Sequence, residues 1–197
     1  MKRLLIIAGP SAVGKTTVAK DILDRGVGFE LSRSATTRAP RGDGHDQEYI
    51  YISESEFRSR ISDGEMLEYT EYGGNIYGTP LTEIKRIFNE GKIPLLVLDI
   101  NGVVSLKSAS HDFSSYAVYI NADMETIDKR LLERAERDGY SEKAMATYER
   151  RMAQNRLDIK RAEELSFLFD LTLVNNEVSE CASEILKSFI DVVFSST

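Results

Sequence analysis

A glycine loop near the N-terminus joins an uninterrupted apolar segment to a helical one and thereby limits the folds open to this chain. Residues 4–8 are all apolar, which is typical of a strand buried on both faces. Gly9-x-x-x-x-Gly14-Lys15-Thr16 follows at once, and residues 17–23 have a helical pattern. Strand, glycine loop and helix in this order are the context that a phosphate-binding P-loop requires. The sequence therefore predicts a nucleoside triphosphate site here.

The chemistry expected of this loop follows from its residue types. The glycines let the backbone curl so that its N–H groups point at phosphate oxygens, and the helix N-terminus adds partial positive charge. Lys15 is expected to reach the β- and γ-phosphates as a catalytic charge, and the Thr16 hydroxyl to bind Mg²⁺. The expected ATP-binding residues are Gly9, Pro10, Ser11, Ala12, Val13, Gly14, Lys15, Thr16 and Thr17.

Three more apolar segments, at 93–98, 116–120 and 169–174, alternate with helical stretches. This alternation predicts an α/β fold whose parallel sheet of buried strands carries helices on both faces. Asp99 follows the first of these segments, so we expect it to lie beside Thr16 and to help hold Mg²⁺, through water.

The composition excludes several classes of protein. A chain of 197 residues can form one compact unit with a full core, and its net charge of −7 argues against nucleic-acid or membrane partners. No apolar run approaches the roughly 20 residues that span a bilayer. Because the single cysteine, Cys181, cannot form an internal disulfide, we expect a cytoplasmic protein in which this thiol is buried on a helix.

Shorter elements are expected between the first helix and residue 93. Strands are predicted at 29–32 and 49–52, and a hairpin at 66–78. Ser53 and Glu56 form a capping box that opens a helix ending at Gly64. A second helix is expected to begin with Thr79 as its N-cap and to end at Gly91.

Two arginine-rich stretches could bind anions. Residues 33–41 carry three arginines and no acid, which suits a phosphate, although a solvated basic loop is equally compatible. Residues 124–164 are helical and highly charged, with a break near Asp138 and Gly139. Arg130, Arg134 and Arg137 share one face of the first helix. Most arginines of this region are expected to be surface charge, and a few to close over phosphates as a lid.

These motifs resemble those of guanylate kinase, a P-loop nucleoside monophosphate kinase, in type and order over nearly the whole chain. The resemblance implies a P-loop NTPase-type parallel sheet flanked by helices, a small mixed α+β NMP-binding lobe and a helical lid. It places all three parts in one domain, 1–197. The core comprises 1–32, 81–128 and 158–197, the lobe 33–80 and the lid 129–157. The motifs that carry it are Gly9-Pro10-Ser11, Gly14-Lys15-Thr16, Thr36-Thr37-Arg38-Ala39-Pro40-Arg41, Tyr49, Glu68, Tyr77-Gly78-Thr79 and Leu98-Asp99-Ile100.

The resemblance also implies a reaction, the Mg²⁺-dependent in-line transfer of a phosphoryl group from ATP to GMP, with these two nucleotides as partners. Glu68 and Thr79 correspond to residues that read guanine. The residues that correspond to holders of the GMP phosphate are Ser34, Arg38, Arg41, Tyr49 and Tyr77.

Two segments depart from the family pattern. After Leu98-Asp99-Ile100 the family usually has a second acid that touches guanine, then Gln-Gly, whereas here a shorter segment continues with Asn101 and Gly102. We assign Asn101 to the acceptor site. In the lid, the spacing to the second arginine is longer than usual, and we select Arg134 and Arg151 as the catalytic pair.

Two alternatives remain from the sequence. One is a kinase for another nucleoside monophosphate or a ribose phosphate, and the other is a non-catalytic interaction module. Retention of Lys15, Thr16 and Asp99 argues against the module.

Overall fold

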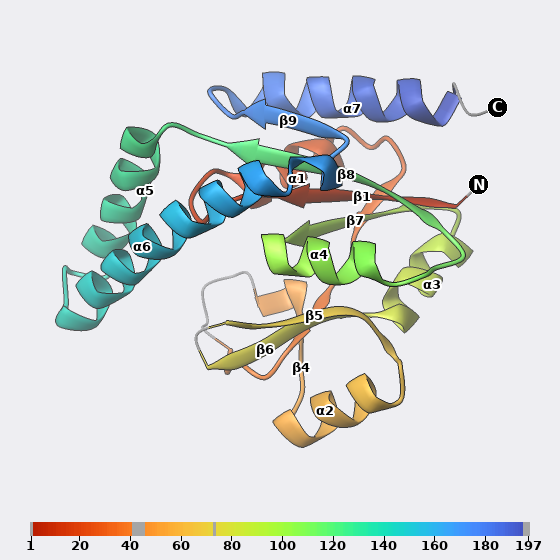
Figure 1. Cartoon of the computed structure of the whole chain (residues 1–197), viewed down its shortest axis with the longest axis horizontal. Coiled ribbons are helices and arrows are strands. Elements are labelled where there is room, and N and C mark those ends of the chain that lie inside the picture. The colour runs from red at the N-terminus through yellow and green to blue at the C-terminus, as the bar shows by residue number, and fades with distance from the viewer. Residues whose placement is uncertain (1, 41–45, 73, 195–197) are drawn as a thin grey trace.

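A central sheet of five parallel strands organises the chain (Figure 1). The computed structural model describes residues 2–40, 46–72 and 74–194. The strand order is β2-β7-β1-β8-β9, and every pair is parallel, which confirms the predicted α/β class. The strands are β1 (Arg3–Ala8), β2 (Phe29–Leu31), β7 (Ile93–Leu98), β8 (Ser114–Asn121) and β9 (Leu171–Val174).

β1 lies in the middle of the sheet and is covered on both faces, which explains its continuous apolar sequence. Leu5 and Ile7 pack in one cluster with α1 (Lys15–Asp24) and α7 (Val178–Phe194). Leu4 and Ile6 pack in the other with α3 (Leu81–Asn89) and α4 (Ile100–Ser108). Cys181 of α7 is buried, as expected.

The last predicted strand, at 169–174, is less buried than the sequence analysis expects. β9 forms where the sequence predicts a strand, but alternate residues are exposed, and Val174 keeps 59% of its surface. Its place at the edge of the sheet is the reason, because an edge strand has a neighbour on one side only.

The lobe is a second, mixed sheet with its own small core (lower part of Figure 1). Phe57 on α2 (Glu54–Ser62) is fully buried against Ala35 and Ile76. The order is β4-β3-β6-β5, with β3 and β4 parallel and the other pairs antiparallel. Its strands are β3 (Ser34–Thr36), β4 (Tyr49–Tyr51), β5 (Met66–Tyr72) and β6 (Asn75–Pro80), and a short 3-10 helix, η1 (Asp46–Glu48), precedes β4.

One predicted cap is confirmed and one is wrong. The Ser53 hydroxyl accepts a hydrogen bond from the Glu56 amide at 3.2 Å, which is the N-cap half of the predicted capping box, while the Glu56 carboxylate accepts from Arg60 at 2.6 Å. Thr79, by contrast, belongs to β6, and α3 begins at Leu81 with Pro80 as its N-cap. The Thr79 hydroxyl donates instead across the sheet to Glu68, at 2.8 Å, so a cross-strand bond has replaced the cap.

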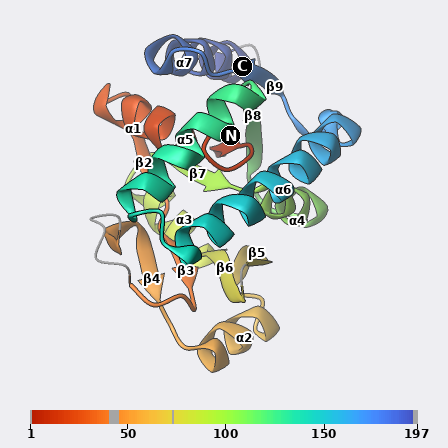
Figure 2. The same ribbon diagram turned by 90° about the vertical axis from the view of Figure 1, so that its left-hand side faces the viewer.

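Two helices contain the expected lid segment 129–157: α5 (Met124–Arg137) and α6 (Glu142–Glu164), separated at the predicted break. Figure 2 shows both helices in front of the sheet. Met152 of α6 packs in the cluster on one face of the sheet and Ala162 in the cluster on the other. The expected lid boundary at 157/158 therefore falls inside one continuous helix. A 3-10 helix, η2 (Ser166–Leu168), connects α6 to the last strand. Within the described residues, no helix combines the length and apolarity needed to cross a membrane.

Replacing Phe57 by Ala tests whether the lobe depends on its own core. Phe57 is 0% exposed, so the change should lower the free energy of unfolding by about 3–5 kcal/mol, measured by chemical denaturation. The same substitution at Phe167, which is 78% exposed, should change it by less than about 0.5 kcal/mol. Equal losses in the two variants would contradict this account.

Candidate active site

The P-loop is the turn between β1 and α1, and its two glycines are required by close neighbours. Gly9 has φ 153°, and a Cβ there would lie 2.1 Å from the backbone oxygen of Ile120. Gly14 has φ 98°, and a Cβ there would lie 2.6 Å from the Asn175 side-chain nitrogen. Any side chain at either position would displace the loop. The predicted nucleotide-binding turn is thus built at the carboxyl end of the central strand.

Side chains from four segments hold the carbonyl groups of this loop. Lys15 Nζ donates to the oxygens of Gly9 and Pro10, at 2.7 and 2.8 Å. The other donors are Asn155 Nδ2 to Ser11 at 3.1 Å, Arg130 Nη1 to Ala12 at 3.1 Å and Asn175 Nδ2 to Val13 at 2.8 Å. Since the N–H and C=O groups of a peptide point in opposite directions, fixing the carbonyls also fixes where the N–H groups point.

Lys15 lies in a charged environment drawn from three parts of the fold. Burial lowers the pKa of its ammonium group to about 8. The nearby carboxylates of Asp99 and Asp158 act in the opposite direction, while Arg134 and Arg151 lower this pKa further. The catalytic residues proposed from sequence are therefore electrostatic neighbours of one another.

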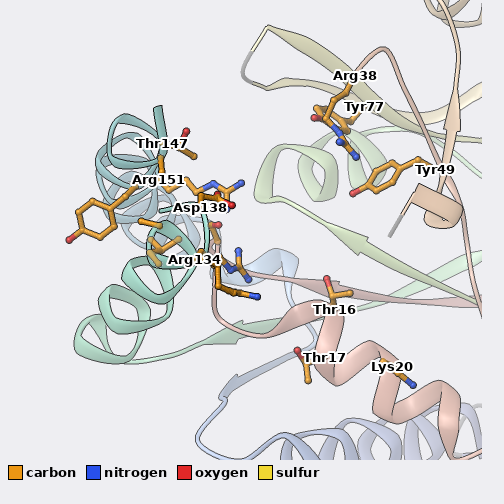
Figure 3. A pocket seen from close by; sticks show the side chains of 16 residues that line it. Thr16, Thr17, Lys20, Arg38, Tyr49, Tyr77, Arg134, Asp138, Thr147 and Arg151 are labelled. Atoms are coloured by element: carbon orange, nitrogen blue, oxygen red, sulfur yellow. The ribbon is translucent and has the colours of Figure 1, made fainter. Parts of the chain in front are cut away.

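A main cavity of about 780 Å³ opens over the P-loop. Figure 3 shows three groups of side chains around it: one along α1, one from the lobe and one from the lid. The α1 side carries Thr16, Thr17 and Lys20, the lobe side Arg38, Tyr49 and Tyr77, and the lid side Arg134, Arg137, Thr147, Tyr148 and Arg151. Positive and hydroxyl groups thus face one space from three directions.

Arg38 is held over two tyrosine rings. Its guanidinium carbon lies 5.2 Å from the centre of the Tyr49 ring and 5.9 Å from that of Tyr51. Stacking of this kind orients a guanidinium group. Nη1 of Arg38 also donates to the Ala39 carbonyl oxygen at 3.2 Å and Nη2 to the Tyr51 hydroxyl at 3.4 Å, so an anion would compete with these two bonds. Arg41, the other arginine assigned to this loop, lies outside the described residues.

Glu68 lies at the side of the main cavity in a smaller pocket of about 190 Å³, here called the Glu68 pocket. The residue is 3% exposed, and burial raises the pKa of its carboxyl group to about 7. The hydrogen bond from Thr79 lowers this pKa, whereas the nearby charge of Asp99 raises it. The pocket is lined by Ser34, Tyr49, Glu68, Thr70, Tyr77, Gly78, Val97, Leu98, Asp99 and Gly102. Ser34, Tyr49, Glu68 and Tyr77, assigned from sequence to one acceptor, therefore meet there.

An irregularity in β5 places Glu68. The pairing of β5 with β6 shifts register between Met66 and Glu68, and such a bulge re-aims the side chain that follows it. Glu68 is then directly opposite Thr79. Because the Thr79 hydroxyl donates to Oε1 of Glu68, Thr79 orients the carboxylate. Thr79 itself is not one of the described residues that line the Glu68 pocket.

Asp99 and Asn101 take different positions at the start of α4. Asp99 follows Leu98, which pairs with Ala8, so it lies beside the beginning of the P-loop, and one of its oxygens accepts from the Gly102 amide at 2.8 Å. Asn101 was assigned to the acceptor site, but its side-chain oxygen accepts a hydrogen bond from Arg161. It lines a different cavity of about 180 Å³, together with Lys15 and Asp158. The structure does not bring Asn101 into the Glu68 pocket.

The structure places further residues at the P-loop and its cavities that the sequence argument did not assign to the site, among them Arg130, which donates to the Ala12 carbonyl oxygen. Arg137 lines the main cavity, and Asp158 lies close to Lys15. Asn155 and Asn175 hold the P-loop. Asn175 directly follows the end of a parallel strand, a position that can be read from sequence as the ligand edge of the sheet. Asn155 lies inside a charged helix and has no comparable signal.

Comparison with known proteins agrees with this geometry. A family model described as guanylate kinase matches residues 1–192. A guanylate kinase of Prochlorococcus marinus subsp. pastoris is 36% identical over 188 residues, covering 95% of this chain and 96% of the relative. One of Enterococcus faecalis is 37% identical over 177 residues, covering 89% and 81%. The crystal structure of guanylate kinase from Anaplasma phagocytophilum matches with a TM-score of 0.68 at 25% identity, covering 93% of this chain and 82% of that one. On these matches the chain belongs to the guanylate kinase family.

Proposed function

We propose that this protein transfers the γ-phosphoryl group of ATP to GMP, giving ADP and GDP. The observation that carries the proposal is the main cavity, in which the P-loop helix, the arginine and tyrosines of the lobe and the lid arginines face one space. A simple ATPase needs one anion site, whereas a kinase for a phosphorylated acceptor needs two that face each other. Arg38 beside Tyr49 and Tyr77 supplies the second site.

The transfer itself requires alignment and positive charge more than covalent chemistry. ATP phosphates occupy the P-loop, where Lys15 exchanges its bonds to Gly9 and Pro10 for phosphate oxygens. Arg134 and Arg151 approach from the lid and stabilise the charge that develops on the moving group. The acceptor is already a phosphate anion, so the reaction needs no general base.

Thr16 and Asp99 are the residues that would hold Mg²⁺. Hydroxyl and carboxylate oxygens are the donors this ion prefers, and one Asp99 oxygen is already engaged by the Gly102 amide. The set is too small to hold the ion alone, which suits Mg²⁺ that keeps several waters and binds together with a nucleotide. When bound, the ion neutralises charge on the β- and γ-phosphates.

Guanine is assigned to the Glu68 pocket. An ionised Glu68 accepts hydrogen bonds, and the N1–H and N2–H₂ groups of guanine present two donors on one edge. Ser34 lines the same pocket, and Tyr49 and Tyr77 line both this pocket and the main cavity. ATP and GMP are thus the proposed partners, and the acidic composition and single cysteine support a cytoplasmic protein without nucleic-acid or membrane partners.

The function is tested by measuring ADP formed from ATP and Mg²⁺ with GMP, dGMP, IMP, AMP, UMP, CMP and ribose phosphates as acceptors. GMP should exceed AMP by at least about 100-fold in kcat/KM, because adenine presents a lone pair at N1 where Glu68 needs a donor. If another acceptor is better than GMP, the substrate assignment is wrong, and if none is phosphorylated, the catalytic proposal is wrong.

Arg38→Ala tests the second anion site. Loss of its charge-assisted hydrogen bonds should raise the KM for GMP by about 10- to 150-fold, while the KM for ATP changes by less than about threefold. Arg58→Ala is the matched control, because Arg58 lies in the same lobe and pairs with Glu54 on the surface of α2. Equal effects of Arg38→Ala on both substrates would remove the loop from the acceptor site.

The raised pKa of Glu68 predicts a pH-dependent selectivity. Above pH 7 the carboxylate is ionised and accepts from guanine, and below pH 7 it becomes protonated and loses that ability. The kcat/KM for GMP should therefore fall by up to about tenfold per pH unit below 7. AMP should fall less, because protonated Glu68 can donate to adenine N1.

The measured quantity is the ratio of kcat/KM for GMP to that for AMP between pH 5.5 and 8.5. Taking the ratio removes titrations that affect both acceptors equally. Glu68→Gln, which has no carboxyl proton to lose, should make the ratio independent of pH. A ratio that is already flat in the unmodified protein would show that Glu68 does not read the base.

A further inference from the structure

The lid helix α6 is attached to the P-loop by a single buried amide. Asn155 is 1% exposed, and its Oδ1 accepts from the Ser11 backbone N–H at 2.8 Å. Its Nδ2 donates to the Ser11 carbonyl oxygen at 3.1 Å. The carboxamide therefore pairs with both backbone polar groups of one residue that lies 144 positions away. The apolar contacts of α6 are less directional, since dispersion and burial do not depend on a bond angle.

Asn155 shares its helix face with the charges that surround Lys15. Arg151 precedes it by four residues and Asp158 follows it by three, so all three project from the same side of α6. They line one cavity of about 180 Å³ with Gly9, Ser11, Lys15, Asp99, Asn101 and Gln154. Any shift of this turn of α6 relative to Ser11 would move Arg151 relative to the phosphate site.

The two hydrogen bonds favour one position of α6 relative to the P-loop. A buried amide is costly when its partners are lost, and here both partners belong to the same residue, so both bonds are made or broken together. Intermediate positions of α6 would leave the amide and the Ser11 backbone without good geometry. The contact thus acts as a latch between the P-loop and the helix that carries Arg151.

We propose that Asn155 is a positioning residue, whose latch to Ser11 sets the guanidinium of Arg151 at the transferring phosphoryl group. This inference rests on the proposed phosphotransfer. Asn155 itself touches no reacting atom. It acts by making the position of α6 depend on the conformation of Ser11, so that a well-formed P-loop and a correctly placed Arg151 occur together.

Removal of the latch should lower kcat more than it alters acceptor binding. A misplacement of about 1 Å can cost on the order of 100-fold in rate, so Asn155→Ala should lower kcat by about 10- to 100-fold. The KM for GMP should change by less than about threefold, because Arg38 and Glu68 are untouched. Asn155→Leu, which keeps a side chain of similar size in the buried site, should behave in the same way.

The decisive test is a double-mutant cycle with Arg151→Ala. If Asn155 works through Arg151, adding Asn155→Ala to Arg151→Ala should change kcat by less than about twofold, since the arginine to be positioned is gone. Leu157→Ala is the control on the same helix, at a side chain that is 62% exposed, and should leave kcat unchanged. Fold-losses that multiply in the double variant would overturn the proposal, and so would an unchanged kcat in Asn155→Ala and Asn155→Leu.

Hydrogen exchange of the Ser11 amide provides a readout that does not depend on turnover. In the folded protein this N–H is bonded to Asn155, so its exchange should accelerate in Asn155→Ala and Asn155→Leu and stay unchanged in Leu157→Ala. If the unmodified protein phosphorylates no acceptor, the proposed function fails while exchange still reports on the latch. If the protein is active and Ser11 exchange is the same in all variants, the latch is refuted and the function stands.

Discussion

Five successive backbone carbonyls, from Gly9 to Val13, each accept a hydrogen bond from a side chain, and these bonds connect the P-loop to several elements of the fold. The donors come from α1, α5, α6 and the residue that follows β9. Ala12 and Val13 of the loop pack into the core cluster beneath it, while its carbonyl groups are held by side chains that other elements supply. The helices α5 and α6 and the residue after the last strand thus all contribute to the shape of one turn at the end of β1.

The main cavity is rich in positive side chains although the chain as a whole is acidic. The chain carries a net charge of −7, yet the main cavity is lined by Lys20, Arg38, Arg134, Arg137 and Arg151, with Asp138 among them. Two anionic substrates repel each other, and a cavity with positive groups on three sides offsets that repulsion while keeping the nucleotides in line. The low pKa of Lys15 has a related origin, because burial removes water from its ammonium group, and the oxygens of a bound anion would compensate that loss.

The acceptor site joins the lobe to the core through a small number of contacts. The bulge in β5 directs Leu67 into the core cluster under the central sheet and Glu68 toward Thr79. Gly102 of α4 closes the pocket from the core side, where a Cβ would come within 3.1 Å of Glu68 Oε2. The base pocket is thus formed by both parts of the fold. At the start of α4, Asn101 accepts a hydrogen bond from Arg161, and it is Gly102 that lines the pocket.

The sequence alone was sufficient for the parallel sheet, the P-loop, the hairpin of the lobe and the two lid helices, because each depends on periodicity or spacing within a short stretch. It also named Lys15, Arg38, Glu68, Arg134 and Arg151, which lie around the connected cavities. Tertiary structure alone decided the partners of polar side chains. The Thr79 hydroxyl could cap a helix or bond across a sheet, and only the position of Glu68 selects between them. Asn155 reaches Ser11 because α6 crosses the carboxyl edge of the sheet, a contact between residues 144 positions apart that no local pattern encodes.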